Sequence, residues 1–236
     1  DVSAHVRLRD SKARRGGDLP IDAGTVVLGE RGVDLPAPNV SLLRATLRDD
    51  ITQNGVGLSW QARNDTWRWN LGVLRTNYEK RFTAADGRTS RREASPTLYN
   101  AGLAWRANDR FELYGSLSRG LEEAGVAPTV AANRNEVLEA VIAKQRELGV
   151  RYAINKRMNM IVAGFQTEKS LATLDPVTGL FGVTGDVRHR GMEFSVTGRP
   201  VDRLTVVFGG VYTDAEVAGP RVALGLAGDR PVGVPK

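Results

Sequence analysis

Apolar and polar residues alternate along several segments of this chain, and the segments come in pairs joined by very short connections. In residues 54–63, Val56 and Leu58 fall on one side of an expected strand, and polar or small residues fall on the other. A polar turn at residues 64–66 leads into residues 67–73, where the alternation continues. A period of two gives a strand one apolar face, so the pattern predicts a β-hairpin.

Three more hairpins and several weaker strands are predicted from the same pattern. The further hairpins span residues 99–119, 145–168 and 187–216. The weaker strand candidates are residues 2–9, 25–31 and 40–48. Together these segments amount to about eleven strands.

Long segments rich in Gly, Pro, Asp and Asn separate successive hairpins. They are residues 81–96, 121–143 and 169–186. One stretch has a different period. In residues 135–148, Val137, Leu138 and Val141 recur at helical spacing, which predicts a short amphipathic helix that runs into the strand beginning near Gln145.

Short turns on one side of a meander and long loops on the other are typical of outer-membrane barrels. Strands that cross a bilayer need about 9 to 11 residues, whereas strands of soluble proteins have about 5 to 6, and the best segments here match the longer class. Beside the short turns stand four aromatic residues that suit an interfacial girdle, namely Trp67, Trp105, Phe111 and Tyr152. We predict an all-β, antiparallel up-and-down transmembrane β-barrel, with a soluble all-β domain as the alternative.

Strand parity also predicts which polar side chains face the interior of such a barrel. These lumen-facing candidates are Gln145, Glu147, Arg151, His189, Glu193, Ser195 and Thr197. A wall that carries both signs of charge suits a water-filled or plugged interior.

The composition of the chain excludes several kinds of binding site and catalytic site. The chain has 236 residues, 33 Lys and Arg against 27 Asp and Glu, a net charge of +6, two His and no Cys, which excludes disulfide scaffolds and Cys-based metal sites. The basic residues are spread along the chain and form no nucleic-acid-binding motif, so we expect no nucleic-acid partner. No P-loop, G-x-S-x-G, G-x-G-x-x-G or H-E-x-x-H sequence occurs, so we expect no enzymatic activity, cofactor or metal site.

Several short motifs in the second half of the chain resemble those of a known family. They read FELYGSLSRG at residues 111–120, QRELGVR at 145–151, RHRGMEF at 188–194 and GDRPVGVP at 228–235. In this order they resemble strands of the TonB-dependent outer-membrane receptors, in particular the siderophore-receptor branch, over roughly residues 96–236. One departure is Glu139, which stands in a region where the family often has a Pro.

The resemblance implies that residues 1–236 form a single partial β-barrel domain, about eleven strands of a barrel of about 22. It implies short periplasmic turns and long extracellular loops, with the plug domain and the final strands absent. A half-barrel leaves two strand edges unpaired in lipid, so we do not expect this fragment to transport on its own.

The resemblance also implies a function and partners. The protein would reside in the bacterial cell outer membrane, in contact with outer-membrane lipid. It would take part in the uptake of ferric siderophores or a similar scarce nutrient, and it would engage the TonB complex through the absent plug. Arginines in the outer loops would attract an anionic chelate.

Two other functions stay open at this point. A passive porin-like or structural outer-membrane barrel is the main alternative, because its strands have the same pattern and it needs no plug. A barrel-embedded hydrolase is disfavoured, because the sequence has no Ser/His/Asp pattern.

Overall fold

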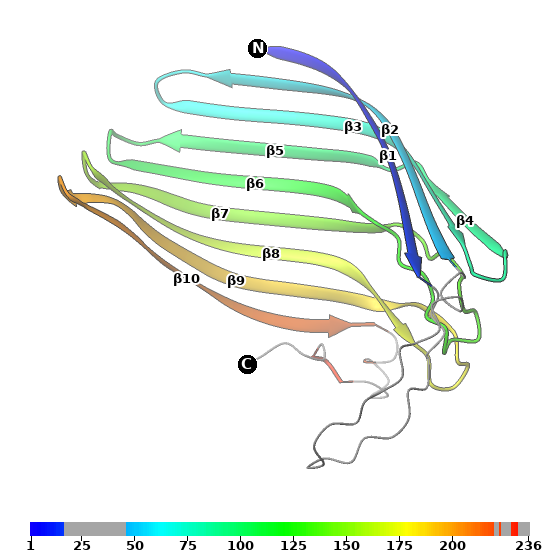
Figure 1. Ribbon diagram of the computed structural model, residues 1–236. Helices are drawn as coiled ribbons and strands as arrows, with labels where there is room; N and C mark the ends of the chain where they lie inside the picture. The colour runs from blue at the N-terminus through cyan, green and yellow to red at the C-terminus, as the bar shows by residue number, and fades with distance from the viewer. Residues whose placement is uncertain (17–45, 220–221, 223–227, 231–236) are drawn as a thin grey trace.

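The computed structural model describes residues 1–16, 46–219, 222 and 228–230, and the strands among them form one antiparallel sheet (Figure 1). The strands are β1 (Val2–Gly16), β2 (Thr46–Arg63), β3 (Trp67–Thr83), β4 (Thr89–Ala94), β5 (Thr97–Arg106), β6 (Phe111–Glu122), β7 (Val141–Asn155), β8 (Met158–Leu174), β9 (Phe181–Val201) and β10 (Leu204–Ala218). Their order is β1-β2-β3-β5-β6-β7-β8-β9-β10, and β4 pairs with the last residues of β3. This is an up-and-down meander, open between β1 and β10, as expected for part of a barrel.

Short and long connections alternate between the two ends of the sheet. The β2–β3, β5–β6, β7–β8 and β9–β10 turns gather at one end, which we call the turn end, and the longer connections lie at the other, the loop end (Figure 1). Asn64 shapes the first short turn, because its Oδ1 accepts hydrogen bonds from the backbone N–H groups of Thr66 and Trp67 at 2.9 and 2.7 Å. Asn108 closes the β5–β6 turn in the same way.

The strand register separates apolar from polar side chains onto two faces. One row of paired residues brings Trp60, Leu71, Ala101 and Leu117 side by side. We call their face the outer face, and the opposite face, which carries Glu147, the inner face. Leu71 and Leu117 are each 48% exposed although both lie within paired strands. The outer face is therefore apolar and uncovered.

Apolar side chains remain exposed on the outer face far along the sheet. Leu113, Leu148 and Phe194, on β6, β7 and β9, are 36%, 62% and 43% exposed. A soluble sandwich would pack these side chains into a core between two sheets. The transmembrane prediction is confirmed, and the soluble alternative is wrong.

The apolar band of the outer face crosses the hydrogen-bond ladder diagonally. On β3 the band ends at Val73. The residues that pair in register with Val73 on the next three strands are Tyr99, Arg119 and Lys144. On β7 the band ends two outer-face positions nearer the turn end, at Leu148. Because the boundaries of a bilayer are flat, this offset means that the strands tilt relative to the membrane normal, as barrel strands do.

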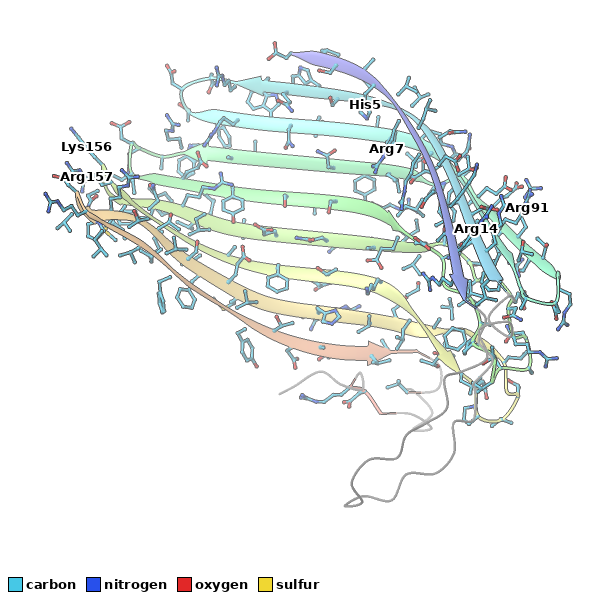
Figure 2. All side chains as sticks on the ribbon, in the orientation of Figure 1. His5, Arg7, Arg14, Arg91, Lys156 and Arg157 are labelled. Carbon is cyan, nitrogen blue, oxygen red and sulfur yellow. The ribbon has the colours of Figure 1, made fainter. Side chains whose placement is uncertain are left out.

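A small core lies on the inner face at the loop end. It comprises Ile51, Tyr78, Phe82, Ala84, Ala124 and Val137. Residues 123–140, which connect β6 to β7, supply Val137, whose side chain is completely buried and whose backbone N–H donates to Ser90 Oγ at 2.9 Å. Arg92 donates to the Val137 carbonyl and to Glu136. These bonds attach the connection to β4, where Arg91 also lies (Figure 2).

The strand count can be compared only over the described residues. They form ten strands, against about eleven expected for the whole chain. The candidate at residues 25–31 lies outside the described residues, and the one at 40–48 is described only from residue 46, where β2 begins. Strand β4 falls in a segment expected to be a loop, because β3 extends to Thr83 and pairs with it.

The helix expected within residues 135–148 is wrong. Asn135 has a φ of 67°, Val137 forms an isolated bridge with Val126, and β7 begins at Val141. Burial of Val137 and pairing of β7 with β6 outweigh the helical spacing of the apolar residues. Within the described ranges, no helix is long and apolar enough to cross a membrane.

Candidate functional site

A cluster of charged side chains covers the inner face of β3, β6 and β7 near the turn end. The register places Glu112 of β6 directly opposite Arg151 of β7. Glu112 accepts a hydrogen bond from Arg151 Nη1 at 2.6 Å and also pairs with Arg68 of β3, which reaches across β5 above the small Ala104. One carboxylate, whose side chain is only 9% exposed, therefore joins two arginines from separate strands.

Tyr114 extends this cluster along β6. Its hydroxyl donates to Glu147 Oε1 at 2.8 Å, and the guanidinium carbon of Arg151 lies 4.2 Å from its ring centroid, a cation–π contact. Gly149 lies beneath the ring, and a Cβ there would come within 2.6 Å of Tyr114 Cζ. The absence of a side chain at Gly149 therefore allows the ring to lie against the sheet.

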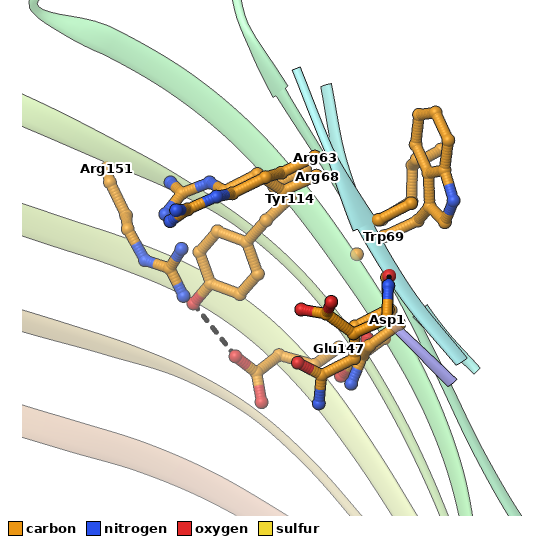
Figure 3. Close-up of a pocket in the computed structure, with 15 residues that line it drawn as sticks. Asp1, Arg63, Arg68, Trp69, Tyr114, Glu147 and Arg151 are labelled. Carbon is orange, nitrogen blue, oxygen red and sulfur yellow. Dashed lines mark hydrogen bonds between the residues drawn. The ribbon is translucent and has the colours of Figure 1, made fainter. Parts of the chain in front are cut away.

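The cluster lines an open cavity of about 1000 Å³ on the inner face. Figure 3 shows Arg63, Arg68 and Arg151 extending toward the same region as Tyr114 and Glu147. Such a wall of donors and acceptors suits contact with a polar protein surface or a hydrated solute. Within the part of the chain that the structure describes, no group of His, Asp and Glu is arranged to hold a metal ion.

All residues predicted to face a lumen lie on the inner face. They are Gln145, Glu147, Arg151, His189, Glu193, Ser195 and Thr197. Glu147 and Arg151 join the cluster around Tyr114, and Gln145 Nε2 lies 3.5 Å from Glu147 Oε2. The other four lie on β9, and no ion pair or side-chain hydrogen bond between described residues connects them to the cluster. Whether any of the seven faces a lumen or a ligand stays a prediction.

Sequence reasoning missed three members of the cluster, namely Arg68, Glu112 and Tyr114. A signal was present, because Arg68 and Glu112 alternate with outer-face aromatic residues in their hairpins. Parity assigns each residue to a face, but it does not show that residues 44 positions apart meet. Their meeting depends on the register of β3, β5 and β6.

A second polar centre lies at the loop end, around the ammonium group of Lys80. This side chain is 3% exposed, and its Nζ lies 3.0 Å from Asp49 Oδ2, 2.8 Å from Glu123 Oε1 and 2.8 Å from the Ala124 carbonyl. Three acceptors match the three N–H bonds of the ammonium group. Lys80 therefore fastens the start of the β6–β7 connection to β2 and β3.

The surroundings shift the pKa values of two groups in this centre. Burial alone would lower the pKa of Lys80, but hydrogen bonds and charge attraction from Glu123 and Asp49 outweigh it and raise the pKa above its usual value. Burial likewise raises the pKa of Tyr78, whose hydroxyl accepts a hydrogen bond from the Ala124 N–H at 3.1 Å. Both groups stay protonated at neutral pH.

The same connection also contacts the start of β9 and the segment before it. Asn133 Nδ2 donates to the Phe181 carbonyl, and Asn133 Oδ1 accepts from the Phe181 N–H, both at 2.9 Å. The Ala132 N–H donates to the Gly179 carbonyl at 2.8 Å. Residues 123–140 thus join two neighbouring loop regions into one surface at the loop end.

Residues 14–236 match the family model of the TonB dependent receptor-like β-barrel. The ferrichrome receptor FcuA of Yersinia enterocolitica is 28% identical over 167 residues, which cover 66% of this chain and 22% of the relative. The metal-pseudopaline receptor CntO of Pseudomonas aeruginosa is 24% identical over 167 residues, covering 65% of this chain and 23% of the relative. The chain thus spans less than a quarter of the length of these curated relatives.

Solved structures share the fold. BauA, the ferric preacinetobactin receptor from Acinetobacter baumannii, superposes with a TM-score of 0.63 at 24% identity, over 80% of this chain and 29% of its own. Fiu, the ferric-catecholate import receptor from E. coli K12, gives a TM-score of 0.68 at 17% identity, over 98% of this chain and 37% of its own. With an exposed apolar outer face, a polar inner face and a family match over most of its length, this chain belongs to the TonB-dependent receptors, as part of their outer-membrane β-barrel.

Proposed function

We propose that this chain forms part of the wall and outer loops of a receptor that takes up ferric siderophores, or a similarly scarce nutrient, with energy from TonB. The observation that carries the proposal is the family match over residues 14–236. The relatives named as receptors for ferrichrome and metal-pseudopaline favour metal chelates as the ligand class.

The two faces of the sheet would have separate roles in such a receptor. The outer face would contact lipid, and the cluster around Glu112 and Tyr114 would offer hydrogen bonds to a plug inside the barrel. We propose that this plug, its contact with TonB and the remaining strands belong to parts of the protein outside these residues. The seven inner-face residues from Gln145 to Thr197 would line the same lumen.

The loop end would be the entrance for the ligand. Residues 123–140 are held in place by Lys80 and Asn133, so they offer a preformed surface. Arg15 and Arg134 are exposed at this end and have no acidic partner within the described ranges. Their charges would attract an anionic chelate, an effect that salt weakens.

The test is uptake of ⁵⁵Fe chelates by cells that lack their own receptors and express the full-length protein containing this chain. The proposal predicts accumulation of at least one ferric siderophore that requires both the protein and TonB. Uptake that is unchanged in cells without TonB would contradict it and would favour the passive porin-like barrel. Accumulation of no ferric siderophore, together with TonB-dependent uptake of another nutrient, would correct the ligand class.

A further inference from the structure

The outer face contains a groove that the proposed function does not use. Its volume is about 1120 Å³. We call it the outer groove. The side chains that line it include three leucines of the apolar band and three polar residues beyond the band, namely Leu103, Leu117, Leu148, Arg146, Gln166 and Arg190. The groove therefore joins an apolar part that faces the bilayer to a cationic part at its loop end.

Large and small residues alternate along one row of the sheet and give the outer groove its shape. The register aligns residues of β5 to β9 in the order Leu103, Gly115, Leu148, Gly164 and Met192. A Cβ would meet its nearest atom at 3.5 Å at Gly115 and at 3.8 Å at Gly164, so no close contact requires either glycine. The glycines instead leave two slots, one on each side of Leu148 and about 10 Å apart across two strand spacings. Each slot has apolar walls and suits a hydrocarbon chain.

Arginine is the first outer-face residue beyond the apolar band on four strands. On β3, β6, β7 and β9 these residues are Arg75, Arg119, Arg146 and Arg190. Tyr99, which pairs with Arg119, suits an aromatic girdle at the same level. The arginines therefore lie where the hydrocarbon meets the head groups of the leaflet at the loop end.

The cations beside the outer groove lack strong acidic partners. Arg119 lies directly opposite Lys144, and like charges in such a pair destabilise a sheet. Arg119 Nε is buried, and no described residue accepts a hydrogen bond from it. Arg146 has no acidic partner in the described part of the chain. Arg190 lies 3.9 Å from Glu216, but both side chains are about half exposed, so an incoming anion can replace Glu216 at little cost.

We propose that the outer groove binds a diphosphorylated glycolipid with several acyl chains, of the lipid A type, in the leaflet at the loop end. Arg146 and Arg190 are the phosphate ligands, because planar guanidinium groups match phosphate oxygens in pairs. They lie in one row with Gln166 between them, so they are two strand spacings apart, about 10 Å. Two cations at this separation suit two phosphates on one head group better than a single phosphate.

The two slots favour the same lipid. They hold acyl chains on either side of Leu148, which keeps the chains further apart than the adjacent chains of a glycerophospholipid. A head group with more than two chains can fill both slots at once. A soluble anion would make no use of the slots, and an apolar partner would make no use of the arginines. The proposal depends on the position of the outer face in the membrane and is independent of the nutrient that the receptor transports.

The experiment uses the full-length receptor, purified in a neutral detergent, freed of bound lipid and titrated with diphosphorylated lipid A or with phosphatidylglycerol while its Tm is recorded. We expect lipid A to raise the Tm at a lower concentration than phosphatidylglycerol. Arg146→Ala and Arg190→Ala should each weaken the apparent affinity for lipid A about fivefold, since a cation near an anionic surface contributes about 1 kcal/mol. The matched control is Arg48→Ala with Arg81→Ala, two outer-face arginines that already pair with Asp50 and Glu79, and it should titrate as the unmodified receptor does.

A second variant, Gly115→Leu with Gly164→Leu, fills the slots and leaves every charge in place. It should fold, because both side chains point into lipid, and it should weaken the apparent affinity for lipid A about tenfold by removing contacts with acyl methylene groups. Folding of each variant is checked by its migration on unheated gels. If the variant with both arginines replaced by alanine does not migrate as folded, the double leucine variant gives the decisive titration.

Several results would overturn the proposal. Unchanged affinity for lipid A in a folded double alanine or double leucine variant would show that the outer groove is not the site. An equal Tm rise with phosphatidylglycerol would remove the preference for a lipid with several chains, and an equal rise with inorganic phosphate would remove the lipid. A receptor that is dimeric in detergent and becomes monomeric in the double leucine variant, with no effect of lipid A, would assign the groove to a second copy of the protein.

Discussion

At the scale of single residues, the inner face depends on a few side chains that connect separate strands. Glu112 joins Arg68 and Arg151, and without it two guanidinium groups would face each other with no carboxylate between them. Gly149 acts by having no side chain, since Tyr114 occupies the space above it. Both effects follow from close contacts between strands and can be tested by substitution.

Glu112→Ala is expected to lower the free energy of unfolding of the full-length receptor by about 1–3 kcal/mol, because a nearly buried acceptor of two charge-assisted hydrogen bonds is lost. The measurement is urea unfolding in liposomes, followed by tryptophan fluorescence. Glu79→Ala is the control. The ion pairs of Glu79 with Arg81 and Arg91 join side chains that are more exposed than Glu112, so the loss of Glu79 should cost less than about 1 kcal/mol. Equal losses for the two variants would show that the Glu112 bridge does not stabilise the sheet.

Gly149→Ala is expected to displace the Tyr114 ring and to cost about 1–3 kcal/mol, as overpacking does. In a Tyr114→Ala background the same substitution should cost little, because the ring that it would meet is gone. Gly115→Ala is the control, since a Cβ at that position meets its nearest atom at 3.5 Å. A double-mutant cycle on urea unfolding measures the coupling, and a coupling near zero would refute the expected contact.

At the scale of elements, the connection between β6 and β7 is an ordered part of the loop end. Lys80 binds its first residues, Ser90 and Arg92 of β4 bind Val137, and Asn133 binds Phe181, the first residue of β9. Its anchors come from three different parts of the chain, so its order depends on the folded sheet.

Lys80→Met is expected to release residues 123–140, because it leaves Asp49 and Glu123 without their shared cation, at a cost of about 3 kcal/mol. Val130→Cys adds a labelling site at an exposed loop position of a chain that has no Cys of its own. The anisotropy of a fluorophore there should fall in the Lys80→Met variant. Lys169→Met, which removes an exposed pair with Glu122, is the control and should leave the anisotropy unchanged.

The same label should report a loss of order at high pH. The pKa of Lys80 is raised in the folded state. Its contribution to the stability of the folded state is therefore fully present below the unfolded pKa of 10.5 and is lost as pH rises through the folded pKa. The raised pKa of Tyr78 acts in the same direction. We expect constant anisotropy between about pH 7 and 9 and a fall above about pH 10.5 that is missing in the Lys80→Met variant.

At the scale of the whole molecule, the sheet divides a lipid-facing surface from a polar one. The diagonal course of the apolar band sets the tilt of the strands in the membrane. On β7, Leu148 accordingly lies in the band, while Lys144, two outer-face positions nearer the loop end, lies beyond it. The loss of stability caused by a charged substitution on the outer face should therefore depend on how deep the residue lies in the membrane.

Leu148→Arg should destabilise the full-length receptor in liposomes by about 1–2 kcal/mol, because Leu148 lies at the loop-end edge of the band, where a cation facing lipid costs less than at the midplane. Gln145→Arg, on the inner face of the same strand, is the matched control and should cost less than about 1 kcal/mol, because its side chain stays in a polar environment. The measurement is the urea midpoint of folded migration on unheated gels. A larger loss for Gln145→Arg than for Leu148→Arg would reverse the assignment of the two faces.

The sequence by itself determined the face to which each strand residue belongs, because strand parity is local and has a period of two. Residues such as Leu113 and Glu147 could therefore be assigned to opposite faces, and the family could be identified from short strand motifs. Only the tertiary structure decided the strand register, the tilt, the presence of β4 and the contact of Glu112 with Arg68. It also replaced the expected helix after Asn135 by a loop anchored on Val137. These features arise from pairing and burial between segments far apart in the chain, which local periodicity does not record.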